Sequence, residues 1–201
     1  MSRKFIVKTL IIATASDWTG TARLPQALSQ WGFVVRALCP KDAFLAMSSY
    51  LEGAYLFEGH PSIRQFAANL QDAFDTWTPE FVIPGDDTAV QSLHLQCQAR
   101  DQSILSRVAL EVIERSLGEP GRFAERERRS LLGQAASVIG ILTPPQVASP
   151  SVEEAHRFVR THNLPVIAKA DYTFAGQGVR ICTTEAELTD CLRKPLWKNT
   201  D

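Results

Sequence analysis

Val166-Ile-Ala-Lys169 and Ala175-Gly-Gln-Gly-Val-Arg180 follow one another closely and decide the fold of the last third of the sequence. Each contains a short apolar run, and the residues between them are typical of a turn. We therefore predict two strands, 165–170 and 178–183, joined by the loop 171–177. The natural pairing of two such strands is an antiparallel hairpin, and we expect it to pack on the helices that flank it.

The same stretch is suited to hold phosphate. Gly176 and Gly178, with Gln177 between them, leave backbone N–H groups open to close approach by an anion. Lys169 ends the first apolar run and would add a point charge, and Arg180 would add a forked one. Because a lysine within an apolar hairpin needs a partner, we expect phosphate binding at Lys169. The alternative for Arg180 is an exposed strand residue.

Two capping boxes mark the helices that flank the hairpin. Ser151-Val-Glu-Glu154 and Thr184-Glu-Ala-Glu187 both have a hydroxyl three residues before a glutamate, a pattern that satisfies the first N–H groups of a helix. Gly118-Glu-Pro-Gly121 interrupts the chain before them. We place the domain boundary there and expect two domains, 1–117 and 118–201, of which the second is a small α+β unit.

The first domain has the alternating pattern of an α/β fold. We predict strands at 9–14, 33–38, 54–57 and 81–84, and helices at 20–31, after Ser62, near Thr88 and at 103–117. The first helix would bury Leu24, Ala27, Leu28 and Trp31 on one face. Strands rich in Val, Ile and Leu that alternate with helices predict a parallel sheet with helices on both faces. A charged helix at 123–139 opens the second domain.

In sheets of this kind, ligands usually lie beyond the carboxyl ends of the strands. The loops 14–20 and 84–88 fall there. Asp86 and Asp87 could hold a hydroxyl or amine of a small substrate, or help to bind a cation. The alternative is that one of them caps the helix that begins near Thr88. The first loop lacks a G-x-G-x-x-G pattern, so no dinucleotide fingerprint is present.

Composition excludes several classes of protein. The net charge of −1 gives no electrostatic footprint for nucleic acid or an anionic membrane. No apolar run approaches the ~20 residues that cross a bilayer. Residues 1–15 resemble a signal peptide, but Lys8 interrupts the apolar stretch, and a buried first strand explains it better.

Cysteine usage favours a reducing compartment. The four cysteines lie at positions without metal-ligand spacing, which predicts reduced thiols in a cytoplasmic protein; a disulfide or a zinc site is the alternative. They are Cys39, Cys97, Cys182 and Cys191. We expect Cys97 and Cys182 to be buried.

Residues 129–188 resemble the ATP-grasp superfamily of carboxylate–amine ligases, which includes biotin carboxylase, carbamoyl phosphate synthetase and D-alanine–D-alanine ligase. Arg129 lies eleven positions before Gly140, the first residue of a Gly-Ile-Leu-Thr-Pro turn. Lys169 ends a strand, and Arg180 comes eleven positions later, after the glycine loop. The first domain is similar to the substrate domain that precedes the nucleotide domain in this family.

The resemblance implies that Lys169 and Arg129 neutralise phosphate charge on ATP, while the backbone of 176–178 supplies donors. Arg180 would orient the loop or touch substrate, and Arg129 could instead be one more charge at a crowded helix start. ATP and magnesium are the cofactors of the family. Its reaction activates a carboxylate as an acyl phosphate and passes it to an amine or similar nucleophile.

The family's adenine hinge and magnesium ligands come later than the matched segment, and the residues 192–201 contain none of them. Phosphoryl transfer relies on metal, so we expect no turnover by this chain alone. Three interpretations stay open: the N-terminal portion of an ATP-grasp ligase, half of a split ligase completed by a second polypeptide, or a non-catalytic small-ligand-binding or interaction protein. All three leave an apolar face or strand edge open, which predicts self-association.

Overall fold

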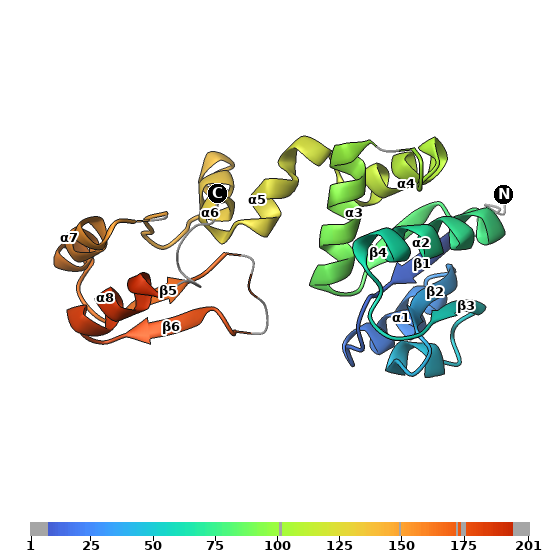
Figure 1. Ribbon diagram of the computed structural model, residues 1–201, viewed down its shortest axis with the longest axis horizontal. Helices are drawn as coiled ribbons and strands as arrows, with labels where there is room; N and C mark the ends of the chain where they lie inside the picture. Colours follow the sequence, from blue (N-terminus) through green and yellow to red (C-terminus); the bar gives the residue numbers. More distant parts are fainter. Residues whose placement is uncertain (1–7, 101, 149, 172, 174–175, 195–201) are drawn as a thin grey trace, which may run out of the picture. The chain divides into compact units, whose positions relative to one another are not determined.

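The computed structural model describes residues 8–100, 102–148, 150–171, 173 and 176–194; the side chains of 126, 127, 129 and 130 are also outside the description. Contacts divide the chain into two compact units, Met1–Gly121 and Arg122–Asp201. Figure 1 labels their elements. Within the described residues, no helix is long and apolar enough to cross a membrane.

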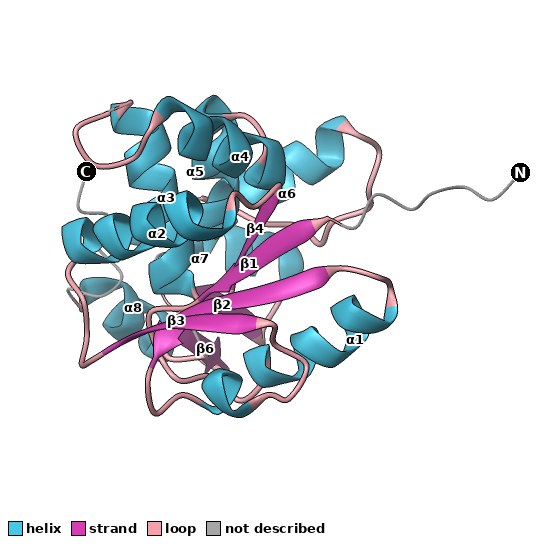
Figure 2. Cartoon of the chain, turned by 90° about the vertical axis from the view of Figure 1, so that its right-hand side faces the viewer, coloured by secondary structure: helices cyan, strands magenta, loops and turns pink. Residues whose placement is uncertain are grey.

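The first unit is a parallel four-stranded sheet with helices on both faces, as predicted. The strand order is β3-β2-β1-β4, and every pair is parallel. Figure 2 shows α1 on one side of this sheet and α2, α3 and α4 on the other. The elements are β1 (Thr9–Ala13), η1 (Thr21–Arg23), α1 (Leu24–Gln30), β2 (Val34–Pro40), η2 (Phe44–Met47), β3 (Gly53–Phe57), α2 (Ile63–Trp77), β4 (Phe81–Pro84), α3 (Asp87–Ala99) and α4 (Arg107–Leu117).

Both faces of the sheet are covered at its central strand β1. Successive side chains of a strand point to opposite faces, so Leu10 and Ile12 pack in one cluster with Leu24 of α1. Ile11, between them, is fully buried as well. On the helix-rich side, α2 begins with the predicted cap at Ser62 and buries an apolar stripe that includes Phe66. The first strand is thus a covered central strand, which explains its near-continuous apolar sequence.

Two helix predictions in this unit need correction. The first helix opens as a short 3-10 turn and ends at Gln30. Ala27 and Trp31 are exposed instead of buried, Trp31 to 85%. Gly32, at a φ of +85°, turns the chain directly after it. The fourth helix begins at Arg107 instead of Ser103, because the Ser106 hydroxyl accepts from Ala109 N and caps it there.

The second unit contains the predicted antiparallel hairpin and two capped helices. Both capping boxes are formed, at Ser151 and at Thr184. The helix predicted at 123–139 is two helices, because Arg128 adopts an extended conformation between them. The elements are η3 (Pro120–Arg122), α5 (Phe123–Glu127), α6 (Arg129–Val138), α7 (Val152–His162), β5 (Val166–Lys169), β6 (Val179–Cys182) and α8 (Glu185–Arg193).

The core of the second unit lies between the helices and one face of the hairpin. Its buried members are Ala155, Val159, Cys182, Leu188 and Cys191, with Val166 and Ala168 packed against them. The buried residues come from α7, α8 and the end of β6. Only one face of the hairpin takes part in this core.

Candidate functional site

Lys169 lies on the face of the hairpin that α7 and α8 do not cover. It pairs with Val179, and Ile167 pairs with Ile181, so these four side chains share one face. Ile167, Val179 and Ile181 are 59%, 37% and 67% exposed, and Lys169 is exposed as well. The apolar run that Lys169 ends is therefore only half-buried, and phosphate binding at Lys169 stays a prediction. Lys169 borders an open apolar face.

Arg180 lies on the opposite face of β6. It pairs with Ala168, which packs toward the helices, whereas Lys169 pairs with Val179. The pairing register therefore separates the two cations that the sequence brings close together. Arg180 is itself exposed, in agreement with the alternative of an exposed strand residue.

The glycine loop has an exposed tip and a tightly packed base. Gly176 and Gln177 are exposed, and Gly176 adopts a φ of +78°, which favours glycine. Val179 N donates to Gly176 O at 3.1 Å and so closes a turn at this point. The tip presents backbone to solvent beside the strand end that carries Lys169.

Gly178 is required for packing within the hairpin. It is buried, and a Cβ placed there would lie 2.1 Å from Thr173 Oγ1. The Thr173 hydroxyl donates to Ala170 O at 2.9 Å, and Ala170 N donates to Gly178 O at 2.8 Å. Gly178 therefore has a structural reason to be glycine, independent of any anion.

Arg129 is the first residue of α6 and follows the extended Arg128. Its side chain is outside the description, as are residues 174 and 175 of the loop. A phosphate contact by Arg129 therefore stays a prediction.

Asp86 is built into the first unit as a structural carboxylate. Its Oδ2 accepts from Ala15 N at 2.7 Å, from Ser16 N at 2.9 Å and from the Thr14 hydroxyl. Its Oδ1 accepts from Ala89 N at 2.8 Å and caps α3. The carboxylate thus fastens the loop after β1 to the start of α3, and the geometry matches the capping alternative.

Asp87 has a different environment from its neighbour. It is the first residue of α3, and it is exposed at the carboxyl edge of the sheet. Beside it, Thr21 Oγ1 donates to Gly85 O at 3.0 Å, and a Cβ on Gly85 would lie 2.7 Å from Thr21 Cγ2. The loops at this edge are therefore closely packed, with Asp87 on their outer side.

Magnesium does not fit the described residues. Among them, no group of three or more His, Cys, Asp or Glu side chains could hold a metal ion. The phosphate part of ATP fits better, because a lysine and an exposed glycine turn adjoin at one end of the open face.

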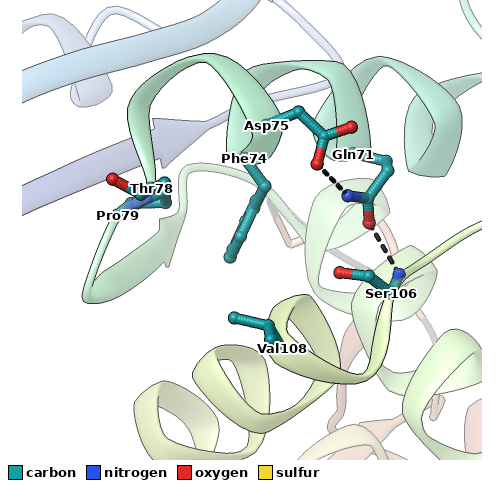
Figure 3. A pocket seen from close by; sticks show the side chains of 7 residues that line it. All are labelled: Gln71, Phe74, Asp75, Thr78, Pro79, Ser106 and Val108. Atoms are coloured by element: carbon teal, nitrogen blue, oxygen red, sulfur yellow. Dashed lines mark hydrogen bonds between the residues drawn. The ribbon is translucent and has the colours of Figure 1, made fainter.

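A hollow of about 330 Å³ lies elsewhere in the first unit (Figure 3). It is lined by Gln71, Phe74, Asp75, Thr78, Pro79, Ser106 and Val108. Gln71 donates to Asp75 Oδ1 at 2.7 Å and accepts from Ser106 N at 2.7 Å. These polar groups already satisfy one another. Because Pro79 precedes β4, the hollow adjoins the amino edge of the sheet, away from Asp87.

The sequence predicted that an apolar face or strand edge would be left open, but not which residues form it. Ile167 on β5 and Val179 and Ile181 on β6 lie at alternate positions of their strands and so share one face. The sequence does not show which face of the hairpin α7 and α8 cover.

Comparison with known proteins gives the family. The family described as carbamoyl-phosphate synthase L chain, ATP binding domain, matches residues 128–200. Over 75 residues the chain is 33% identical to the carbamoyl phosphate synthase large chain of Hyperthermus butylicus, covering 37% of this chain and 7% of that one. Residues 128–200 are thus similar to an ATP-binding domain of the ATP-grasp superfamily, in agreement with the resemblance found in the sequence.

Solved structures show the same fold. The biotin carboxylase domain of Hydrogenobacter thermophilus 2-oxoglutarate carboxylase, solved with MgADP and bicarbonate, matches with a TM-score of 0.56 and 18% identity over 94% of the chain. N5-carboxyaminoimidazole synthase from Aspergillus clavatus, solved with ADP and 5-aminoimidazole ribonucleotide, matches with a TM-score of 0.59 and 10% identity over 96%. The chain spans 42% and 44% of the lengths of these two proteins.

Proposed function

We propose that the hairpin β5–β6 supplies part of an ATP site, with the Lys169 ammonium against the phosphates and the turn at 176–178 providing backbone donors. The observation that carries this proposal is the pairing register, which places Lys169 at the end of the open face formed by Ile167, Val179 and Ile181. An apolar face can pack against a planar base, and a lysine at its end offsets phosphate charge. Arg129 is the second proposed phosphate ligand.

The proposed parent activity is ATP-dependent activation of a carboxylate and its ligation to an amine or similar nucleophile. The family match of residues 128–200 supports it, as does the nucleotide bound in both structural relatives described above. Turnover would require magnesium, and the described residues supply no metal cluster. We therefore propose that these 201 residues do not turn over alone.

At the carboxyl edge of the first unit, Asp87 is the better candidate for a substrate contact. Asp86 already accepts backbone and hydroxyl hydrogen bonds at both carboxylate oxygens, whereas Asp87 is exposed. We also propose a cytoplasmic location, which the free thiols of all four cysteines support.

Amide chemical shifts test the phosphate site. Labelled protein is titrated with ATP and, separately, with inorganic tripolyphosphate. We expect millimolar affinity and shifts concentrated at Lys169 and 176–179. Lys169→Ala should abolish them, whereas Arg180→Ala, on the opposite face of the hairpin, should leave them nearly unchanged.

Two outcomes would contradict the proposal: no change at 176–179 with either ligand, or equal shifts in wild type and Lys169→Ala. Shifts with ATP alone, centred on Ile167 and Ile181, would place the base on the open face and remove the phosphate assignment.

An exposed apolar surface on α6 and the segment after it favours a partner polypeptide. Its members are Leu132 at 53%, Val138 at 86%, Ile139 at 71%, Ile141 at 55% and Leu142 at 99% exposure. Several exposed apolar side chains within one short segment are typical of an interface. We propose that either further ATP-grasp polypeptide or a second copy of the chain covers it.

Sedimentation velocity over a concentration series tests the partner. We expect reversible self-association that the paired change Ile139→Asp and Leu142→Asp weakens at least tenfold. Val108→Asp is the matched control, because Val108 is 63% exposed in the first unit. A monomer at every concentration would contradict the proposal that a second copy of the chain covers this surface.

A further inference from the structure

The second unit contains two buried thiols in one small core cluster. Cys182 is the last residue of β6 and Cys191 lies in α8, and they are 2% and 5% exposed. Both belong to the same cluster of five buried residues, and each thiol affects the pKa of the other. The fold therefore brings the two thiols close together, although eight residues separate them in the sequence.

We propose that Cys182 and Cys191 form an oxidation-sensitive pair that a low-molecular-weight disulfide, such as glutathione disulfide, converts into an intramolecular disulfide. The product fastens β6 to α8 covalently. Because β6 is half of the hairpin that carries the open face, oxidation would stiffen that face. The inference does not depend on nucleotide binding.

The reaction balances in two exchange steps. The Cys182 thiolate attacks one sulfur of glutathione disulfide, the glutathione S–S bond breaks, and one glutathione leaves as a thiolate that takes up a proton. The Cys191 thiolate then attacks the Cys182 sulfur of the mixed disulfide, and the second glutathione leaves in the same way. Two protein thiols are oxidised and one glutathione disulfide is reduced to two glutathiones.

The surroundings of the two thiols favour one order of attack. Burial raises the pKa of both thiols, that of Cys191 to about 11, whereas the neighbouring Cys191 lowers the pKa of Cys182 and Cys182 raises that of Cys191. Cys182 is therefore the thiol that ionises more readily. Since the thiolate is the nucleophile, closure is slow at neutral pH and accelerates as pH rises.

Cys39 and Cys97 are natural internal controls. Both are fully buried, and burial raises the pKa of each to about 11. Asp17 also raises the pKa of Cys39. For Cys97, Glu114 raises the pKa and Arg100 lowers it. No second thiol affects the pKa of either cysteine. Cys39 and Cys97 are thus buried like Cys182 and Cys191, but they lack a neighbouring thiol that affects their pKa.

Peptide mapping of the wild-type chain tests the proposal. Trypsin releases Ile181–Arg193, which contains Cys182, Cys191 and no other cysteine. Reduced protein is incubated with glutathione disulfide, denatured, alkylated without reduction and digested. We expect this peptide to be two hydrogens lighter than its dithiol form and to carry no alkyl group, while the Cys39 and Cys97 peptides are fully alkylated.

Two variants isolate the pair. Cys39→Ser should leave closure unchanged, whereas Cys191→Ser should leave Cys182 as a glutathione adduct or a free thiol. In the wild type, a doubly alkylated or glutathione-bearing peptide 181–193 would overturn the proposal. So would oxidation of Cys39 and Cys97 to the same extent.

Discussion

The two units use the same strand pattern but differ in how it is covered. In the first unit, β1 is buried on both faces, and the Ser116 hydroxyl accepts from Val82 N at 3.0 Å on the neighbouring edge strand β4. In the second, β5 alternates between half-buried and exposed residues, because α7 and α8 pack on one face only. The central strand of the first sheet is covered on both faces, whereas the hairpin leaves one face exposed.

This difference separates structural from functional candidates. Asp86, in the covered unit, has its carboxylate oxygens occupied by the protein's own donors. Lys169, in the open unit, borders exposed Val179 and is free of the core. Of the polar residues that the sequence predicted as ligands, those whose hydrogen-bonding atoms already bind the protein's own donors have a structural role. Those that are exposed stay candidates for ligand contact.

Truncation of buried and open side chains should give the largest contrast. Phe66, 1% exposed in α2, should lose about 3–5 kcal/mol of stability as Phe66→Ala, because a cavity replaces the ring. Ile181→Ala on the open face should change stability by less than about 0.5 kcal/mol. Urea unfolding followed by circular dichroism measures both. Comparable losses would show that the hairpin face is covered in solution.

Substitution of the neighbouring residues Asp86 and Asp87 should give the second-largest difference in stability. Asp86→Ala removes the cap of α3 and leaves the amides of Ala15 and Ser16 without their acceptor, so we expect a loss of about 3 kcal/mol. Asp87→Ala, at an exposed position, should stay within about 0.5 kcal/mol. Chemical denaturation monitored by tryptophan fluorescence compares the two variants. Equal effects would remove the structural assignment of Asp86.

The smallest of the three effects should be the loss of helix-end stability when acid protonates the glutamates of the capping boxes in the second unit. Hydrogen bonds from the backbone and hydroxyl of Ser151 lower the pKa of Glu154 from its ordinary 4.5. A lowered pKa stabilises the folded state above the ordinary value, and that stabilisation is lost as pH falls through the folded pKa. Amide exchange at the start of α7, measured relative to the intrinsic rate at each pH, should therefore accelerate below about pH 4.5.

Glu154→Gln is the matched variant for this prediction. Its amide oxygen still accepts from Ser151 N but does not titrate, so the acceleration at the start of α7 should disappear. The second box provides a repeat of the experiment, because hydrogen bonds from Thr183 likewise lower the pKa of Glu187. Acid-induced exchange that is equal in wild type and Glu154→Gln would contradict the assignment.

Local sequence signals predicted the elements well, and long-range contacts account for what they missed. The strand 81–84 and both capping boxes were predicted correctly, because each is specified by neighbouring residues. The bond from Ala15 to Asp86 spans 71 positions and has no local signature. Trp31 is exposed because the helix ends one residue earlier, a boundary that periodicity does not fix.

The candidate site was predictable as a set of residues but not as an arrangement. Lys169 and Arg180 were identified together from their spacing, yet a hairpin register that pairs Lys169 with Val179 sends Arg180 to the other face. The need for glycine at 178 was attributed to an anion, whereas the Thr173 side chain occupies the space a Cβ would need. Strand register and side-chain packing depend on contacts between distant residues, so they cannot be predicted from the chemistry of each residue alone.

Amine labelling of Lys169 tests the central claim most directly. Protein is exposed briefly to an acetylating reagent with and without millimolar ATP, and the modified lysines are quantified by peptide mass spectrometry. The account predicts that ATP slows modification of Lys169 while Lys41 and Lys194, which pair with Glu58 and Asp190, label at unchanged rates. Equal labelling of Lys169 with and without ATP, or the same protection at all three lysines, would contradict it.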